Sequence, residues 1–212
     1  VMTVLKFGGK FEKGAYQTSG GLHGVGVTVV NFLSEWANVE VHRDGEVHQQ
    51  EYERGVPTGP VKKTGIKTKK RGTKTTFKPD SQIFQTTKYV FDVLYKRLQE
   101  LAFLNRGVRI AFKDLRNNEG DEFCYERGIV EFVEHLNRAS DALHQDVIYI
   151  SGETDDVGYE IAVQYCGEYV ENVQSYVNNI HTHEGGTHVS GFRSALTRTL
   201  NNYGKKEGVI KD

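Results

Sequence analysis

A glycine-rich stretch near the start of the chain, Ser19-Gly20-Gly21-Leu22-His23-Gly24-Val25-Gly26, could hold a chain of phosphate groups. Glycine has no Cβ, so its backbone N–H groups can approach an anion closely. An apolar run with helical spacing, Val25, Val29, Val30 and Leu33, follows at once, and the free N–H groups and positive dipole end of such a helix favour an anion. These residues therefore indicate a nucleotide-phosphate site.

The spacing differs from the two common phosphate loops. It is G-x-x-G-x-G, whereas a dinucleotide fold needs G-x-G-x-x-G directly after a buried strand, and residues 16–19 are polar. A P-loop needs G-K-[ST] at the start of its helix, but Lys10 lies upstream of the glycines. From spacing alone, a flexible loop without a ligand is the competing interpretation.

The residues upstream favour the nucleotide interpretation. Gly8-Gly9-Lys10-Phe11 follows a short apolar run, and Tyr16 lies between it and the glycines. Lys10 offers a compact cation for terminal phosphate oxygens, and Tyr16 offers a phenol that could bond to or stack on a base. The whole window therefore predicts a lid over a nucleotide.

Taken in order, these motifs resemble the ATP lid of bacterial type IIA topoisomerases, the gyrase B family, whose nucleotide fold is the Bergerat or GHKL fold. The resemblance covers essentially the whole chain. Its further motifs are Arg71-Gly72-Thr73, Leu101-Ala102-Phe103-Leu104-Asn105, Gly185-Gly186-Thr187-His188 and Leu196-Thr197-Arg198-Thr199-Leu200-Asn201.

The resemblance implies that the cofactor is ATP and assigns residues to it. Tyr16 corresponds to the tyrosine that bonds the adenine, and Thr73 to the threonine that closes the adenine pocket. Thr75 and Gln17 depart from the family, which often has an apolar residue and a lysine there. The residues assigned to the triphosphate are Lys10, Gly20, Gly21, Leu22, His23, Gly24, Val25 and Gly26.

No catalytic or metal-binding residue is assigned in this chain. In the family, the glutamate general base, the magnesium-binding asparagine and the aspartate that reads adenine would precede Val1, and a glutamine-threonine-lysine loop would follow Asp212. Hydrolysis needs a positioned base and a metal. We therefore expect an intact parent that hydrolyses ATP with Mg²⁺, and no turnover from this fragment alone.

The family also implies partners: gyrase A or its topoisomerase IV counterpart, double-stranded DNA, and a second copy that dimerises through the ATPase region when ATP binds. Two alternatives to gyrase B remain, its topoisomerase IV counterpart and a regulatory or chaperone module that shares only the GHKL lid. A net charge of −1 gives no general attraction to nucleic acid. Without a signal segment or a long apolar run, we expect a cytoplasmic protein with no membrane contact.

Hydrophobic periodicity predicts an α+β fold. We expect helical turns before Gly8, a helix from the lid to about Trp36, and a hairpin around Asp44-Gly45. Further helices are expected over Phe91–Leu101, over Ile129–Leu136 and in a last segment with Thr187 as its N-cap. The resemblance divides the chain into residues 1–127, part of a GHKL ATPase sandwich with the lid, and residues 128–212, part of a transducer domain with a ribosomal protein S5 domain 2-like fold.

Three other groups of residues attract attention. His181, His183 and His188 lie near Glu184, but they lack the spacing of a zinc site, so we expect no metal there. The basic run at residues 62–71 could bind DNA, but it has no aromatic residues to stack bases, so a solvated hairpin loop is favoured. Arg193 and Arg198 are the better DNA candidates by resemblance to the family's transducer. Cys124 and Cys166 are expected to be free thiols.

Overall fold

The structure is a computed structural model that describes residues 2–5, 24–155 and 157–210. Its chain divides into two compact units, residues 1–89 and 90–212, and each is described by itself. The first unit contains α1 (Gly26–Phe32), β1 (Ser34–Arg43), β2 (Glu46–Glu53), β3 (Val56–Pro57), β4 (Lys62–Lys67) and β5 (Gly72–Pro79).

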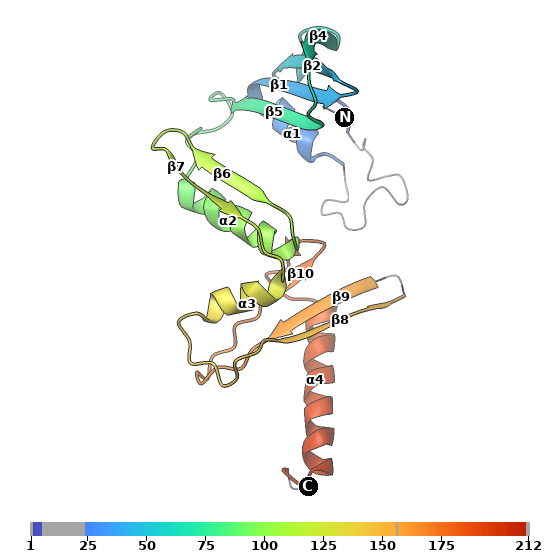
Figure 1. Cartoon of the computed structure of the whole chain (residues 1–212), viewed down its shortest axis with the longest axis vertical. Coiled ribbons are helices and arrows are strands. Elements are labelled where there is room, and N and C mark those ends of the chain that lie inside the picture. Colours follow the sequence, from blue (N-terminus) through green and yellow to red (C-terminus); the bar gives the residue numbers. More distant parts are fainter. Residues whose placement is uncertain (1, 6–23, 156, 211–212) are drawn as a thin grey trace. The chain divides into compact units, whose positions relative to one another are not determined.

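An antiparallel sheet makes up most of the first unit. Its strands lie in the order β3-β2-β1-β5, and β4 also pairs with β2 (Figure 1). The predicted hairpin is confirmed: β1 and β2 are joined at Asp44-Gly45, where φ is +54° and +80°, as a two-residue type I′ turn requires. Ala37, Val47 and Tyr52 are the buried apolar residues of this sheet.

The helix after the lid is shorter than predicted. It ends at Phe32, and β1 begins at Ser34, so the prediction that it reaches Trp36 is wrong. Ser34 donates its hydroxyl to the Val30 carbonyl at 2.6 Å and pairs with Pro79 of β5, which draws the chain into the sheet. Residues 2–5 contain no helix, so the helical turns expected there are absent from the described part of that segment.

Close packing at the turn between β2 and β3 fixes α1 against the sheet. Gly55 has a φ of +84°, and a Cβ built on it would lie 1.9 Å from the Phe32 ring. Only glycine fits both the backbone conformation and this approach.

The second unit, over its described residues, contains one long helix, two shorter ones and three hairpins (Figure 1). Both cysteines are free, as predicted. No helix in the described ranges is long and apolar enough to cross a membrane. The elements are α2 (Phe91–Leu104), β6 (Ile110–Asp114), β7 (Glu119–Phe123), α3 (Ile129–Asn137), β8 (Ile148–Thr154), β9 (Val157–Val163), β10 (Tyr176–Val177), β11 (Ile180–His181) and α4 (Thr187–Lys206).

Helix α2 is the centre of the second unit. Its first half packs on the β6–β7 hairpin through Phe91 against Phe112 and Tyr95 against Phe123, each with ring centroids 5.0 Å apart. Its last turn contributes Phe103, which is 2% exposed and stacks on Tyr125 and on Phe132 of α3. The periodicity that predicted this helix is therefore the pattern of its buried face.

The β10–β11 hairpin contacts the carboxyl-terminal half of α2. The Tyr176 hydroxyl donates to Glu100 at 2.5 Å, and burial raises the pKa of Tyr176. Asn179, at the tip of the hairpin, donates its amide to the Asn105 side chain at 2.8 Å. Since Asn105 follows the last helical residue, the hairpin tip lies against the end of α2.

Helix α4 begins one residue earlier than expected. Thr187 is its first helical residue and Gly186 its N-cap, with no side-chain capping bond, so the prediction of Thr187 as N-cap is wrong. Gly186 has a φ of +153°, a conformation open to glycine that brings the chain into the helix at this point.

Candidate nucleotide site

The described part of the glycine-rich stretch lies at the start of α1. Gly24 has a φ of +58°, which side chains with a Cβ rarely adopt. Val25 is the N-cap, and the first turn has neither a side-chain cap nor an acidic residue. The first helical bond runs from the Val29 amide to the Val25 carbonyl at 2.8 Å, so the preceding N–H groups lie outside the helical ladder. This end of α1 is suited to an anion.

The rest of the predicted lid lies outside the described residues. Its members are Lys10, Tyr16, Gly20, Gly21, Leu22 and His23, and their roles stay predictions.

Thr73 lies near the start of β5, opposite Val41 of β1, in the same compact unit as the lid. Its side chain is exposed. Alternation along the strand places Thr73 and Thr75 on one face of the sheet and Lys74 on the other. The face with Thr73 is therefore the one on which an adenine would lie if the predicted role is right.

Asn31 is a positioning residue that the sequence analysis missed. It is 1% exposed, and its amide donates to the Met2 carbonyl at 3.1 Å and to the Gly55 carbonyl at 3.3 Å. It thereby joins α1 to the segment before the lid and to the β2–β3 turn. A polar residue within an otherwise apolar helical run was the available signal.

A second polar contact, Arg54 with Asp80, closes the same region. Arg54 Nε donates to Asp80 Oδ2 at 2.7 Å, and the Gln82 amide donates to Asp80 Oδ1 at 2.9 Å. Asp80 is 1% exposed, and its own amide donates to the Leu33 carbonyl at the end of α1. The Gln82 amide and the Arg54 guanidinium hold the pKa of Asp80 below its usual value.

Replacing Asp80 should therefore have a pH-dependent effect on stability. A carboxyl whose pKa is lower in the folded state stabilises it above the unfolded pKa of about 3.9 and loses that effect as the pH falls through the folded pKa. We expect Asp80→Asn to lower the free energy of unfolding at pH 7, with a difference from the unmodified protein that shrinks below about pH 4. Denaturant unfolding across this range measures it. The exposed Asp44→Asn should show no such trend, and a constant difference for Asp80→Asn would contradict the assignment.

The histidines and arginines of the second unit do not form a site. His181 and His183 contact each other at 3.2 Å, and His188 contacts Thr182. No group of three or more potential metal ligands occurs among the residues that the structure describes. Arg193 forms an ion pair with Glu171 at 2.7 Å, so its charge is already compensated.

Comparison with known protein families matches residues 128–212 to the DNA gyrase B family model. Over its whole length, the chain is 53% identical to DNA gyrase B of Halalkalibacterium halodurans and 49% identical to the corresponding B chain of DNA topoisomerase 4 from Staphylococcus epidermidis. It spans 33% and 32% of the length of these two relatives.

Among solved structures, the chain is similar to the 43K ATPase domain of Thermus thermophilus gyrase B in complex with an aminocoumarin. The TM-score is 0.80 at 36% identity, over 89% of this chain and 52% of that one. The predicted α+β class, a partial GHKL fold followed by an S5-like region, is confirmed by this likeness and by the antiparallel sheets.

The fold and the site thus define the class: the ATPase region of type II topoisomerases. Within that class, the chain belongs to the DNA gyrase B family.

Proposed function

We propose that this chain is the ATP-binding region of the ATPase subunit of a type II DNA topoisomerase, in which ATP binding and hydrolysis are coupled to DNA strand passage. The observation that carries the proposal is the identity of about half of all residues to gyrase B along the entire chain. The likeness to a gyrase B ATPase domain supports it.

In this proposal, Lys10 and the backbone of residues 20–26 hold the triphosphate, Tyr16 bonds the adenine, and Thr73 closes its pocket. The conformation of Gly24 and the uncapped first turn of α1 fit this role. Mg²⁺ bound with ATP would neutralise charge on the phosphates. No residue of this chain is assigned to the metal.

The proposed partners are gyrase A, double-stranded DNA and a second copy of the protein that dimerises when ATP binds, in the cytoplasm. We also propose that the ATPase domain ends and the transducer begins near residues 127 and 128. The match of the gyrase B family model, which begins at residue 128, supports this boundary.

The intact protein, assembled with gyrase A of its own organism, should introduce negative supercoils into relaxed plasmid only when ATP is present. Gel analysis of the plasmid topoisomers measures this. ATP-dependent relaxation or decatenation without supercoiling would favour topoisomerase IV, whose B chain is nearly as similar. ATP binding with no strand passage in any assay would overturn the proposal in favour of a regulatory or chaperone module.

A further inference from the structure

An unusual concentration of positive charge lies along β4 and the turn into β5. Residues 61–74 contain seven lysines and arginines and no aspartate or glutamate, although the whole chain has a net charge of −1. These seven residues are Lys62, Lys63, Lys67, Lys69, Lys70, Arg71 and Lys74.

Acidic neighbours in the described part of the chain compensate three of these charges. Lys63 and Lys67 reach Glu46 at 2.9 and 3.1 Å, and together they lower the pKa of Glu46 to about 2. Lys74 reaches Glu40 at 3.0 Å. The other four side chains are exposed and form no ion pair with any described residue. We call these four the basic edge: Lys62, Lys69, Lys70 and Arg71.

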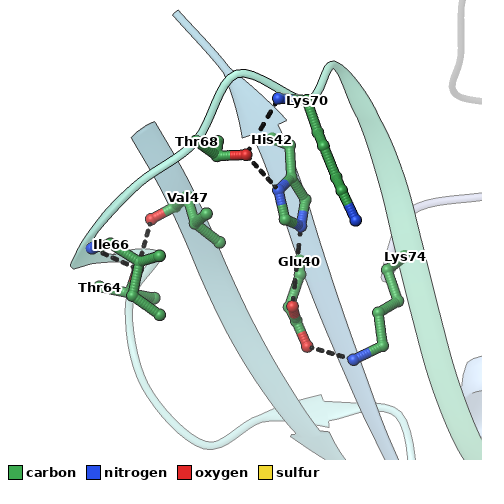
Figure 2. A network of polar contacts seen from close by, with 8 residues as sticks. All are labelled: Glu40, His42, Val47, Thr64, Ile66, Thr68, Lys70 and Lys74. Atoms are coloured by element: carbon green, nitrogen blue, oxygen red, sulfur yellow. Dashed lines mark hydrogen bonds and ion pairs between the residues drawn. The ribbon is translucent and has the colours of Figure 1, made fainter. Parts of the chain in front are cut away.

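The turn that presents the basic edge is held in place. The Thr68 hydroxyl accepts a hydrogen bond from the Lys70 amide at 3.0 Å and bonds to His42 Nδ1 of β1 at 3.4 Å (Figure 2). The Thr68 amide donates to the Gly45 carbonyl at 3.0 Å. Because the turn is fixed at both its side chain and its backbone, little conformational entropy would be lost when its cations meet a ligand.

The same network places the turn on the face of the sheet away from Thr73. Glu40, His42 and Lys74 share one face, as Figure 2 shows, whereas Thr73 alternates with Lys74 onto the other. A ligand at the basic edge would therefore not compete with a nucleotide beside Thr73.

We propose that the basic edge is a contact surface for the phosphate backbone of double-stranded DNA. The proposal rests on the proposed function, which makes duplex DNA the substrate. Uncompensated lysine and arginine side chains neutralise phosphates and release counterions. No aromatic residue occurs between residues 61 and 74, so the contact is independent of sequence. The solvated loop favoured by sequence alone gives way because the turn is ordered and its charges are uncompensated.

The test compares two variants of the intact protein with equal changes in charge. The first, Lys62→Glu/Lys69→Glu/Lys70→Glu, alters the basic edge and leaves Arg71, which is close to Thr73. The second, Lys88→Glu/Lys96→Glu/Lys113→Glu, alters exposed lysines outside residues 61–74. Fluorescence anisotropy with a short duplex, between about 50 and 200 mM salt, gives the affinity and its salt dependence.

For the basic-edge variant, we expect duplex affinity to fall by roughly tenfold or more at the lower salt, and the slope of log K against log salt to decrease in magnitude by about 3, since each lost phosphate contact removes about 0.9. The control variant should change the slope by less than about 1. An unchanged melting temperature shows that each variant is folded.

Equal changes in the two variants, or an unchanged slope for the first, would overturn the proposal. Unchanged duplex binding with weakened assembly with gyrase A would assign the surface to an acidic protein partner instead, and would also overturn it. Failure of the proposed function is recognised separately, because it removes plasmid supercoiling by the unmodified protein without altering the comparison of salt slopes.

Discussion

Replacing Gly24 by valine should lower ATP affinity by about 100-fold, equivalent to about 2.7 kcal/mol. Gly24 lies directly before the N-cap of α1 with a φ of +58°. A β-branched residue is strongly disfavoured in this conformation, and its side chain would keep an anion away from the neighbouring amides. Titration of the intact protein with a non-hydrolysable ATP analogue, followed by calorimetry, measures the loss.

The matched control is Gly208→Val. Gly208 also has a positive φ, +69°, and nothing lies within 4 Å of a Cβ built on it. It therefore suffers the same backbone strain at a position with no predicted role in nucleotide binding. Equal affinities for the two variants would show that Gly24 does not contact the triphosphate, and the predicted lid would have to be moved.

The largest effect on stability is expected for Phe103→Ala. The Phe103 ring is stacked 3.6 Å from Tyr125 and 4.9 Å from Phe132 between centroids, and it is almost fully buried. Removing a buried aromatic ring leaves a cavity and costs about 3–5 kcal/mol. Hydrogen exchange of the α2 amides in the intact protein, as a function of denaturant, should show this loss locally.

Leu115→Ala serves as the control, because Leu115 is 82% exposed and its truncation buries or uncovers almost nothing. We expect it to change the protection of α2 by less than about 0.5 kcal/mol. A loss below about 1 kcal/mol for Phe103→Ala would mean that the aromatic stack is not the core of this unit.

Much of the secondary structure could be predicted because its signals are local. The Asp44-Gly45 turn has a strong hairpin preference, and the apolar spacing of α2 is the pattern of the face that packs on β6 and β7. The end of α1 could not be predicted in the same way. Ser34 enters a strand because Pro79, far along the chain, pairs with it.

The candidate site divides along the same line. Gly24 and Gly26 could be found from sequence because their backbone requirements restrict the residue type. Asn31 and the Arg54–Asp80 pair could not, because their roles depend on partners brought together by folding: Gly55 for Asn31, and a carboxylate 26 residues away for Arg54.

The position of α2 limits where this family can be recombined. A chimera joined at residue 128, where the family model begins, would inherit Phe132, Tyr176 and Asn179 from one parent and their partners on α2 from the other. A seam between Tyr89 and Val90 keeps the helix and all three contacts in a single parent.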